Sequence, residues 1–105
     1  MDEPDDVRRE DIVIEWDEGR ATAAAGQSVR IGRDDSMDVT VDDPLVSREH
    51  AQIVWEDGWF LVDAGSKNGT FVEGRPVARY PVRDRVTVRC GHARNGPMLS
   101  RSIGP

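Results

Sequence analysis

The sequence is short of several residue types, and each shortage excludes a class of protein. A single cysteine, Cys90, among 105 residues excludes an internal disulfide framework and fits a reducing compartment. No apolar run reaches membrane-spanning length and no secretory signal is present, so we expect this segment to be soluble and not to insert into a membrane. Lys67 is the one lysine among 14 basic side chains, which we interpret as coding bias.

Basic side chains are also fewer than acidic ones, with 14 lysines and arginines against 20 aspartates and glutamates. The formal net charge is -6, which argues against a nucleic-acid-binding surface. Residues 1–11 hold six acidic side chains and two arginines, a net of -4, and this leaves -2 for the remaining residues. We therefore expect a flexible acidic tail over residues 1–11, one domain over residues 12–100 and a short C-terminal tail over residues 101–105.

Helical periodicity is missing, and short runs with β-strand alternation take its place. Strands are predicted at residues 11–16, 28–32, 38–42, 50–56, 58–63, 70–72, 75–77 and 85–89, with an edge strand at 98–100. The run 58–63 is apolar on both faces and predicts a central strand. Tight turns are expected at Asp57-Gly58 and Glu73-Gly74. Many short strands of this kind predict an all-β antiparallel sandwich or barrel.

Four landmarks in the loops are more specific than the strands. They are Ile31-Gly32-Arg33, Ser47 to Ala51 (SREHA), Asp63 to Thr70 (DAGSKNGT) and Val72 to Val77 (VEGRPV). In this order and spacing they resemble the forkhead-associated (FHA) domain, and the resemblance covers roughly residues 12–95. It implies an antiparallel β-sandwich of about eleven short strands. It also implies a phosphothreonine-peptide binder with no catalytic activity.

The landmark residues suit a phosphate chemically. A phosphothreonine carries about -1.5 to -2 charges and strong acceptor oxygens. Arg33 offers a forked cation and Ser47 a hydroxyl donor, while the Asn68 amide matches a peptide backbone. The resemblance places these three at the family's binding positions. Arg48 and Lys67 stand at positions that vary in the family, and we expect them to make auxiliary phosphate contacts.

Three further residues are expected to support the binding loops: Gly32, His50 and Gly69. A serine-histidine catalytic pair is the alternative for Ser47 and His50, but such a pair would need a third, orienting acid and an oxyanion hole, and no G-x-S-x-G elbow is present. The resemblance instead implies that His50 braces the loops by hydrogen bonds. Asn68-Gly69 is also expected to form a type I′ turn.

Other chemical signals fail. Cys90 and His92 lack further ligands for zinc. A calcium loop starting at Asp34 would need glycine where Val39 stands and glutamate where Leu45 stands. No nucleotide-binding glycine loop is present, so we predict no metal, no cofactor and no enzyme activity. Four more arginines are interpreted as solvated charges: Arg75, Arg79, Arg83 and Arg85.

Two functions from different classes stay open. The first is recognition of a phosphothreonine on a partner phosphorylated by a Ser/Thr kinase. The second is a phospho-independent interaction or oligomerisation domain on the same fold. Thr22 is the first threonine, so the acidic tail cannot supply the ligand.

The sequence also suggests a wider context. We expect the N-terminal module of an actinobacterial ABC transporter or signalling protein, in the cytoplasm or on the cytosolic side of a membrane protein. Leu45 suggests an apolar peptide residue near position +3, and a small apolar pocket would favour threonine over serine by about 0.8 kcal/mol for one methyl group.

Overall fold

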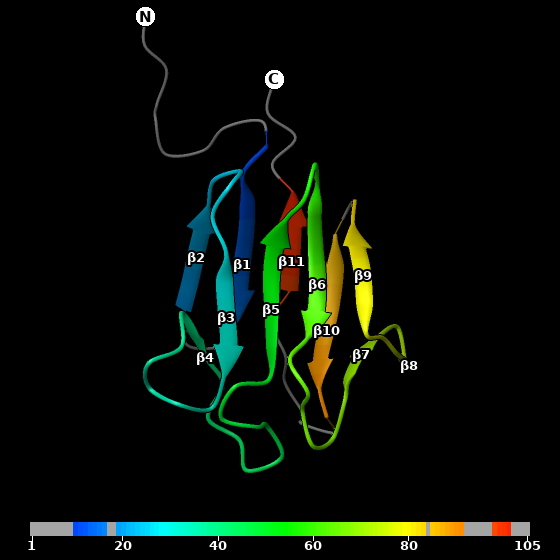
Figure 1. Ribbon diagram of the computed structural model, residues 1–105. Coiled ribbons are helices and arrows are strands. Elements are labelled where there is room, and N and C mark those ends of the chain that lie inside the picture. The colour runs from blue at the N-terminus through cyan, green and yellow to red at the C-terminus, as the bar shows by residue number, and fades with distance from the viewer. Residues whose placement is uncertain (1–9, 17–18, 84, 92–97, 102–105) are drawn as a thin grey trace, which may run out of the picture.

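Eleven strands and no helix make up the part of the chain that the computed structural model describes, residues 10–16, 19–83, 85–91 and 98–101. The strands are β1 (Ile12–Trp16), β2 (Gly19–Ala23), β3 (Val29–Gly32), β4 (Val39–Thr40), β5 (Ala51–Trp55), β6 (Trp59–Asp63), β7 (Thr70–Val72), β8 (Arg75–Pro76), β9 (Arg79–Val82), β10 (Val86–Cys90) and β11 (Met98–Arg101). They form two sheets that face each other (Figure 1). The predicted all-β sandwich is confirmed.

One sheet has six strands in the order β2-β1-β11-β10-β7-β8, and the other has five in the order β4-β3-β5-β6-β9. The apolar residues of β3, β5 and β10 alternate toward the space between the sheets. In β10, for example, Val86, Val88 and Cys90 are buried while Thr87 and Arg89 are exposed. Because β6 lies between β5 and β9, the prediction of a central strand at residues 58–63 is confirmed.

Trp59 anchors the core and reaches the start of the domain. Its side chain is buried, and its ring packs edge-on against Trp55 with centroids 5.3 Å apart. The indole Nε1 donates a hydrogen bond to the Glu10 carbonyl oxygen at 2.7 Å. Asp11, next in the chain, is buried. The Glu10 carbonyl and the buried Asp11 therefore belong to the sandwich, although Glu10 as a whole is exposed.

Several strand predictions need correction. The run at 98–100 does form a strand, but β11 lies between β1 and β10 and is not at an edge. The pair β3 and β4 is parallel, since Ile31 faces Val39 and Gly32 faces Thr40. Position within a sheet depends on partners far away in the sequence, which local alternation does not reveal.

Two strands were missed. β2 (GRATA) has no large apolar residue to mark a face, and β9 (RYPV) contains a proline. The proline is tolerated because β9 is the last strand of its sheet and pairs only with β6. Both strands are recognisable only through their pairing.

The tight turns at Asp57-Gly58 and Glu73-Gly74 join neighbouring strands, and Asp57 and Glu73 adopt positive φ angles of 58° and 53°. The type I′ turn expected at Asn68-Gly69 is wrong. A type I′ turn needs a positive φ at both central residues. Gly69 has a φ of 90°, but Asn68 does not have a positive φ, since among the non-glycine residues of the described ranges only Asp57 and Glu73 do. The physical reason is that residues 64–69 cross from one sheet to the other between β6 and β7, so they do not close a hairpin.

Candidate functional site

Three loops meet at one end of the sandwich (Figure 1). They are residues 33–38 between β3 and β4, residues 41–50 between β4 and β5, and residues 64–69 between β6 and β7. An open pocket of about 320 Å³ lies among them. All five predicted binding residues line it, in company with Pro44, Leu45 and Val46: Arg33, Ser47, Arg48, Lys67 and Asn68.

Arg33 is held against the second loop from two sides. Its backbone N–H donates to the Ser47 carbonyl at 3.0 Å, and its side-chain Nε donates to the Val46 carbonyl at 2.9 Å. The Nε contact uses one of the five N–H donors of a guanidinium. The end of a guanidinium fork can make bidentate contacts with phosphate oxygens, and Arg33 lines the pocket.

Gly32 permits this close approach of strand and loop. A Cβ atom at this position would lie 2.0 Å from the Arg48 carbonyl oxygen, far inside any contact distance. The same carbonyl accepts a hydrogen bond from the Asp34 N–H at 3.3 Å. Gly32 does not have a positive φ, so the requirement for glycine is steric and not conformational. The atom that a Cβ would meet belongs to the backbone.

Two hydrogen bonds tie the second loop to the third. The Lys67 backbone N–H donates to Ser47 Oγ at 3.0 Å, and Asn68 Nδ2 donates to the Leu45 carbonyl at 2.9 Å. A hydroxyl that accepts a hydrogen bond still has its proton to donate, so Ser47 can serve a phosphate oxygen in this position. Asn68 keeps its side-chain carbonyl as an acceptor for a peptide N–H.

His50 lies beneath these loops with no exposed surface. Nδ1 accepts a hydrogen bond from the Ser47 backbone N–H at 3.0 Å, and Nε2 lies 2.7 Å from the Gly69 carbonyl oxygen. A carbonyl can only accept, so Nε2 carries the proton and the ring is the neutral tautomer. Both ring nitrogens are engaged by backbone, and the Ser47 hydroxyl is paired with Lys67 instead. The ring therefore links two loops, and it is not arranged as a base for Ser47.

The Gly69 carbonyl oxygen is shared. It also accepts the Gly91 N–H at 2.6 Å, from the end of β10. The Gly69 N–H donates to Ser66 Oγ at 2.9 Å. Gly69 therefore joins the third loop to His50, to Ser66 and to the six-stranded sheet.

Asp63 organises the third loop, although sequence reasoning gave it no role. Its Oδ1 accepts from the hydroxyls of Ser66 at 2.6 Å and Thr70 at 2.7 Å. Its Oδ2 accepts from the backbone N–H groups of Gly65 at 3.0 Å and Ser66 at 3.1 Å. Burial raises the pKa of Asp63, but these hydrogen bonds outweigh it and hold the pKa below its usual value. The signal that sequence reasoning passed over is the Asp63-x-x-Ser66 spacing, which is typical of side chains that bond the local backbone.

The charges around the pocket are mainly acidic. Residues 33–50 hold six acidic side chains and two arginines. Asp34, Arg48 and Glu49 line a neighbouring hollow of about 390 Å³. Hydrogen bonds from the Ser36 hydroxyl and N–H lower the pKa of Asp34, and Arg48 and Arg30 lower it further. A phosphate here would be held by a few cationic side chains at the pocket, although the surrounding side chains are mainly acidic.

Within the described ranges, no three His, Cys, Asp or Glu side chains are grouped so as to hold a metal ion. No helix in the same ranges has the length and apolar character needed to cross a membrane.

Comparison with known proteins agrees with this arrangement. The chain is 34% identical over 94 residues to the ABC transporter ATP-binding/permease protein Rv1747 of Mycobacterium tuberculosis, an alignment that covers 89% of this chain and 11% of the transporter. The crystal structure of the first FHA domain of that protein superposes with a TM-score of 0.79 at 28% identity, over 90% of this chain and 99% of the domain.

A second solved structure, from a study of phosphothreonine-dependent FHA domain interactions, superposes with a TM-score of 0.71 at 28% identity, over 90% of this chain and 98% of the other. The family model for the FHA domain matches residues 29–91, which run from β3 through the three loops to the end of β10. The chain therefore belongs to the FHA domain family.

Proposed function

We propose that this domain recognises phosphothreonine on a partner protein phosphorylated by a Ser/Thr kinase, and that it catalyses no reaction. One observation carries the proposal: five side chains from three loops converge on one pocket. They supply three cations, a hydroxyl and an amide, which is the donor set that a phosphopeptide requires.

Each residue has a separate role in the proposal. Arg33 grips two phosphate oxygens, and Ser47 donates its hydroxyl to a phosphate oxygen. Arg48 and Lys67 add positive charge from opposite loops, which strengthens binding at low ionic strength. Asn68 binds the peptide backbone. Hydrogen bonds within the protein join the loops to one another, which lowers the ordering cost of binding.

The comparisons support this function by similarity. The related structure described above belongs to work on phosphothreonine-dependent FHA domain interactions. The chain spans 11% of the length of the mycobacterial transporter that it resembles. We therefore propose that the domain serves as a docking module within a larger signalling or transport protein, on the cytosolic side of the membrane.

The test is binding of three otherwise identical peptides that carry phosphothreonine, phosphoserine or unmodified threonine. We expect tight binding of the phosphothreonine form, roughly fourfold weaker binding of phosphoserine, since one buried methyl is worth about 0.8 kcal/mol, and no measurable binding of the unmodified form. Arg33→Ala should lower affinity roughly 100-fold, because it removes two charge-assisted hydrogen bonds.

Arg20→Ala is the matched control, because Arg20 is exposed on β2 and lies outside the pocket lining. It should leave binding unchanged. Equal affinity for the phosphorylated and unmodified peptides would reject the proposal in favour of a phospho-independent interaction domain.

A further inference from the structure

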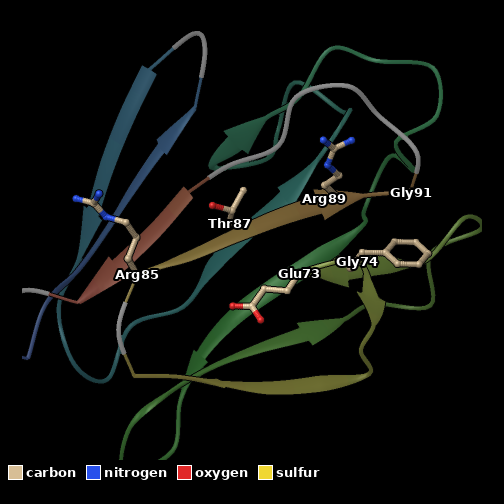
Figure 2. A pocket seen from close by; sticks show the side chains of 7 residues that line it. Glu73, Gly74, Arg85, Thr87, Arg89 and Gly91 are labelled. Carbon is tan, nitrogen blue, oxygen red and sulfur yellow. The ribbon is translucent and has the colours of Figure 1, made fainter.

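A second pocket, larger than the first, lies on the outer face of the six-stranded sheet. It has a volume of about 680 Å³ and spreads over β7 and β10 (Figure 2). Arg85, Thr87 and Arg89 line one side. Phe71 and Glu73 line the other.

Strand alternation explains these side chains. Val86 and Val88 point into the core, so Thr87 and Arg89 point outward with Arg85, which precedes the strand (Figure 2). Phe71 lies directly opposite Arg89 in the register of β7 and β10. The pocket is therefore built by ordinary strand geometry.

The lining of this second pocket is cationic, as is the lining of the first. Two arginines and one glutamate, Glu73, give its lining a net charge of +1. The first pocket is lined by Arg33, Arg48 and Lys67 but is surrounded by the six acidic side chains of residues 33–50. A ligand for the second pocket should therefore be acidic.

The two pockets share a wall. A Cβ atom on Gly91 would lie 2.8 Å from Asn68 Cβ and 3.0 Å from the Leu45 carbonyl oxygen. Gly91 lines the second pocket, whereas Asn68 and Leu45 line the first. A peptide that leaves the first pocket past Asn68 therefore arrives at the end of β10.

We propose that the second pocket binds an acidic segment of the same phosphorylated partner, extended along β10 away from the phosphothreonine. This inference rests on the proposed function. Strand rise is about 3.3 Å per residue, so Arg89 lies roughly 7 Å and Arg85 roughly 20 Å along the strand from Gly91. If the peptide residue next to the phosphothreonine lies at Gly91, acidic residues about three and about seven positions from the phosphothreonine would meet these two arginines.

The test is fluorescence anisotropy with a short phosphothreonine peptide and with versions extended by ten residues on either side. Each extension carries glutamate at the two expected distances, or glutamine as an uncharged match. On one of the two sides, the glutamate peptide should bind three- to tenfold more tightly than the glutamine peptide at low salt, because each exposed ion pair contributes modestly. The gain should fall as salt is added.

Variants locate the effect. Arg85→Ala alone should reduce the gain, and Arg85→Ala with Arg89→Ala should abolish it without weakening the short peptide. Glu73→Gln should increase the gain, since it removes a repelling charge. Arg75→Ala is the matched control, because Arg75 is exposed on β8 and lies outside the lining. Thermal unfolding checks that each variant folds.

The outcomes separate this inference from the proposed function. One outcome is that the short peptide binds and loses binding in Arg33→Ala, while glutamate on either side gives no benefit. This outcome would overturn the proposed role of the second pocket and leave phosphothreonine recognition intact. A benefit that survives in the double arginine variant would overturn it too. If the short phosphopeptide does not bind at all, the proposed function fails and the extended interface fails with it. A wild-type dimer that dissociates in the double variant would assign this face to a second copy of the chain and overturn the inference.

Discussion

The candidate phosphate pocket is held among loops whose polar groups already bond to one another, whereas the pocket over β7 and β10 is lined by side chains that alternate along strands. In the first, Arg33, Ser47 and Asn68 each make a hydrogen bond to another loop. In the second, backbone bonding follows the ladder between β7 and β10. Substitutions near the first pocket should therefore disturb both fold and binding, while substitutions in the second should alter charge with little effect on the fold.

The largest effect is expected at Gly32. Gly32→Ala places a methyl group against the Arg48 carbonyl, so strand and loop must separate. We expect the free energy of unfolding to fall by about 3 to 5 kcal/mol and phosphopeptide binding to be lost, as measured by urea denaturation and anisotropy. Gly65→Ala is the control: its φ is 79° but a Cβ atom there would meet nothing within 4 Å, so strain alone should cost about 1 to 2 kcal/mol. Equal losses in both variants would refute the steric account of Gly32.

His50→Ala should rank second. It leaves the Ser47 N–H without its acceptor and removes one donor to the Gly69 carbonyl, at about 1 to 3 kcal/mol for each buried group. Urea denaturation should show a loss of about 2 to 5 kcal/mol, and phosphopeptide affinity should fall with it. Val46→Ala, a neighbouring core truncation, should reduce stability but keep more of the affinity, since the Val46 carbonyl still holds Arg33. A His50→Ala protein with full affinity would show that the loops do not need the ring.

Asp63→Asn tests the third loop through pH. The folded pKa of Asp63 lies below its usual 3.8, so its stabilisation is complete above about pH 5 and is lost as pH falls through the folded pKa. At neutral pH the variant should lose about 1 to 3 kcal/mol, since an amide nitrogen replaces an acceptor. The difference from wild type should shrink below pH 3.8 in acid denaturation. A difference that does not change with pH would contradict this role. Asp34→Asn, at a half-buried residue, should show a smaller effect.

The smallest effect comes from a matched pair of threonines. Thr70 is buried and donates to Asp63, whereas Thr87 is exposed in the second pocket. Thr70→Val should cost about 0.5 to 1.5 kcal/mol for a lost hydrogen bond, and Thr87→Val should change stability by less than about 0.5 kcal/mol. Thermal unfolding measures both. A reversal of this order would contradict the structural role given to the Thr70 hydroxyl.

Strand faces could be predicted from the sequence because burial and alternation are local properties. The inward Val86 and Val88 of β10 follow directly from the pattern. The loops required the FHA resemblance, since Arg33, Ser47 and Asn68 lie far apart in the chain and their meeting depends on how three strands end. Asp63 was missed because its partners, Ser66 and Thr70, look like ordinary turn residues until the loop is folded.

Sheet order could not be predicted, because it depends on pairing between distant segments. The parallel pairing of β3 with β4 and the place of β11 between β1 and β10 are both of this kind. β2 has no apolar pattern of its own and takes its strand form from pairing with β1. Family resemblance indicated how many strands to expect but did not say which neighbours each would have.

The central place of β11 has a consequence for synthesis of the chain. β1 and β10 each pair with β11, the last strand described, and in the finished sheet they do not pair with each other. A nascent chain on the ribosome therefore holds two open strand edges until Arg101 emerges, and closing the gap brings together segments from opposite ends of the domain. Exposed edges of this kind invite pairing between chains. A polypeptide that stops before residue 98 should thus aggregate even though every residue of the candidate phosphate pocket has already been made.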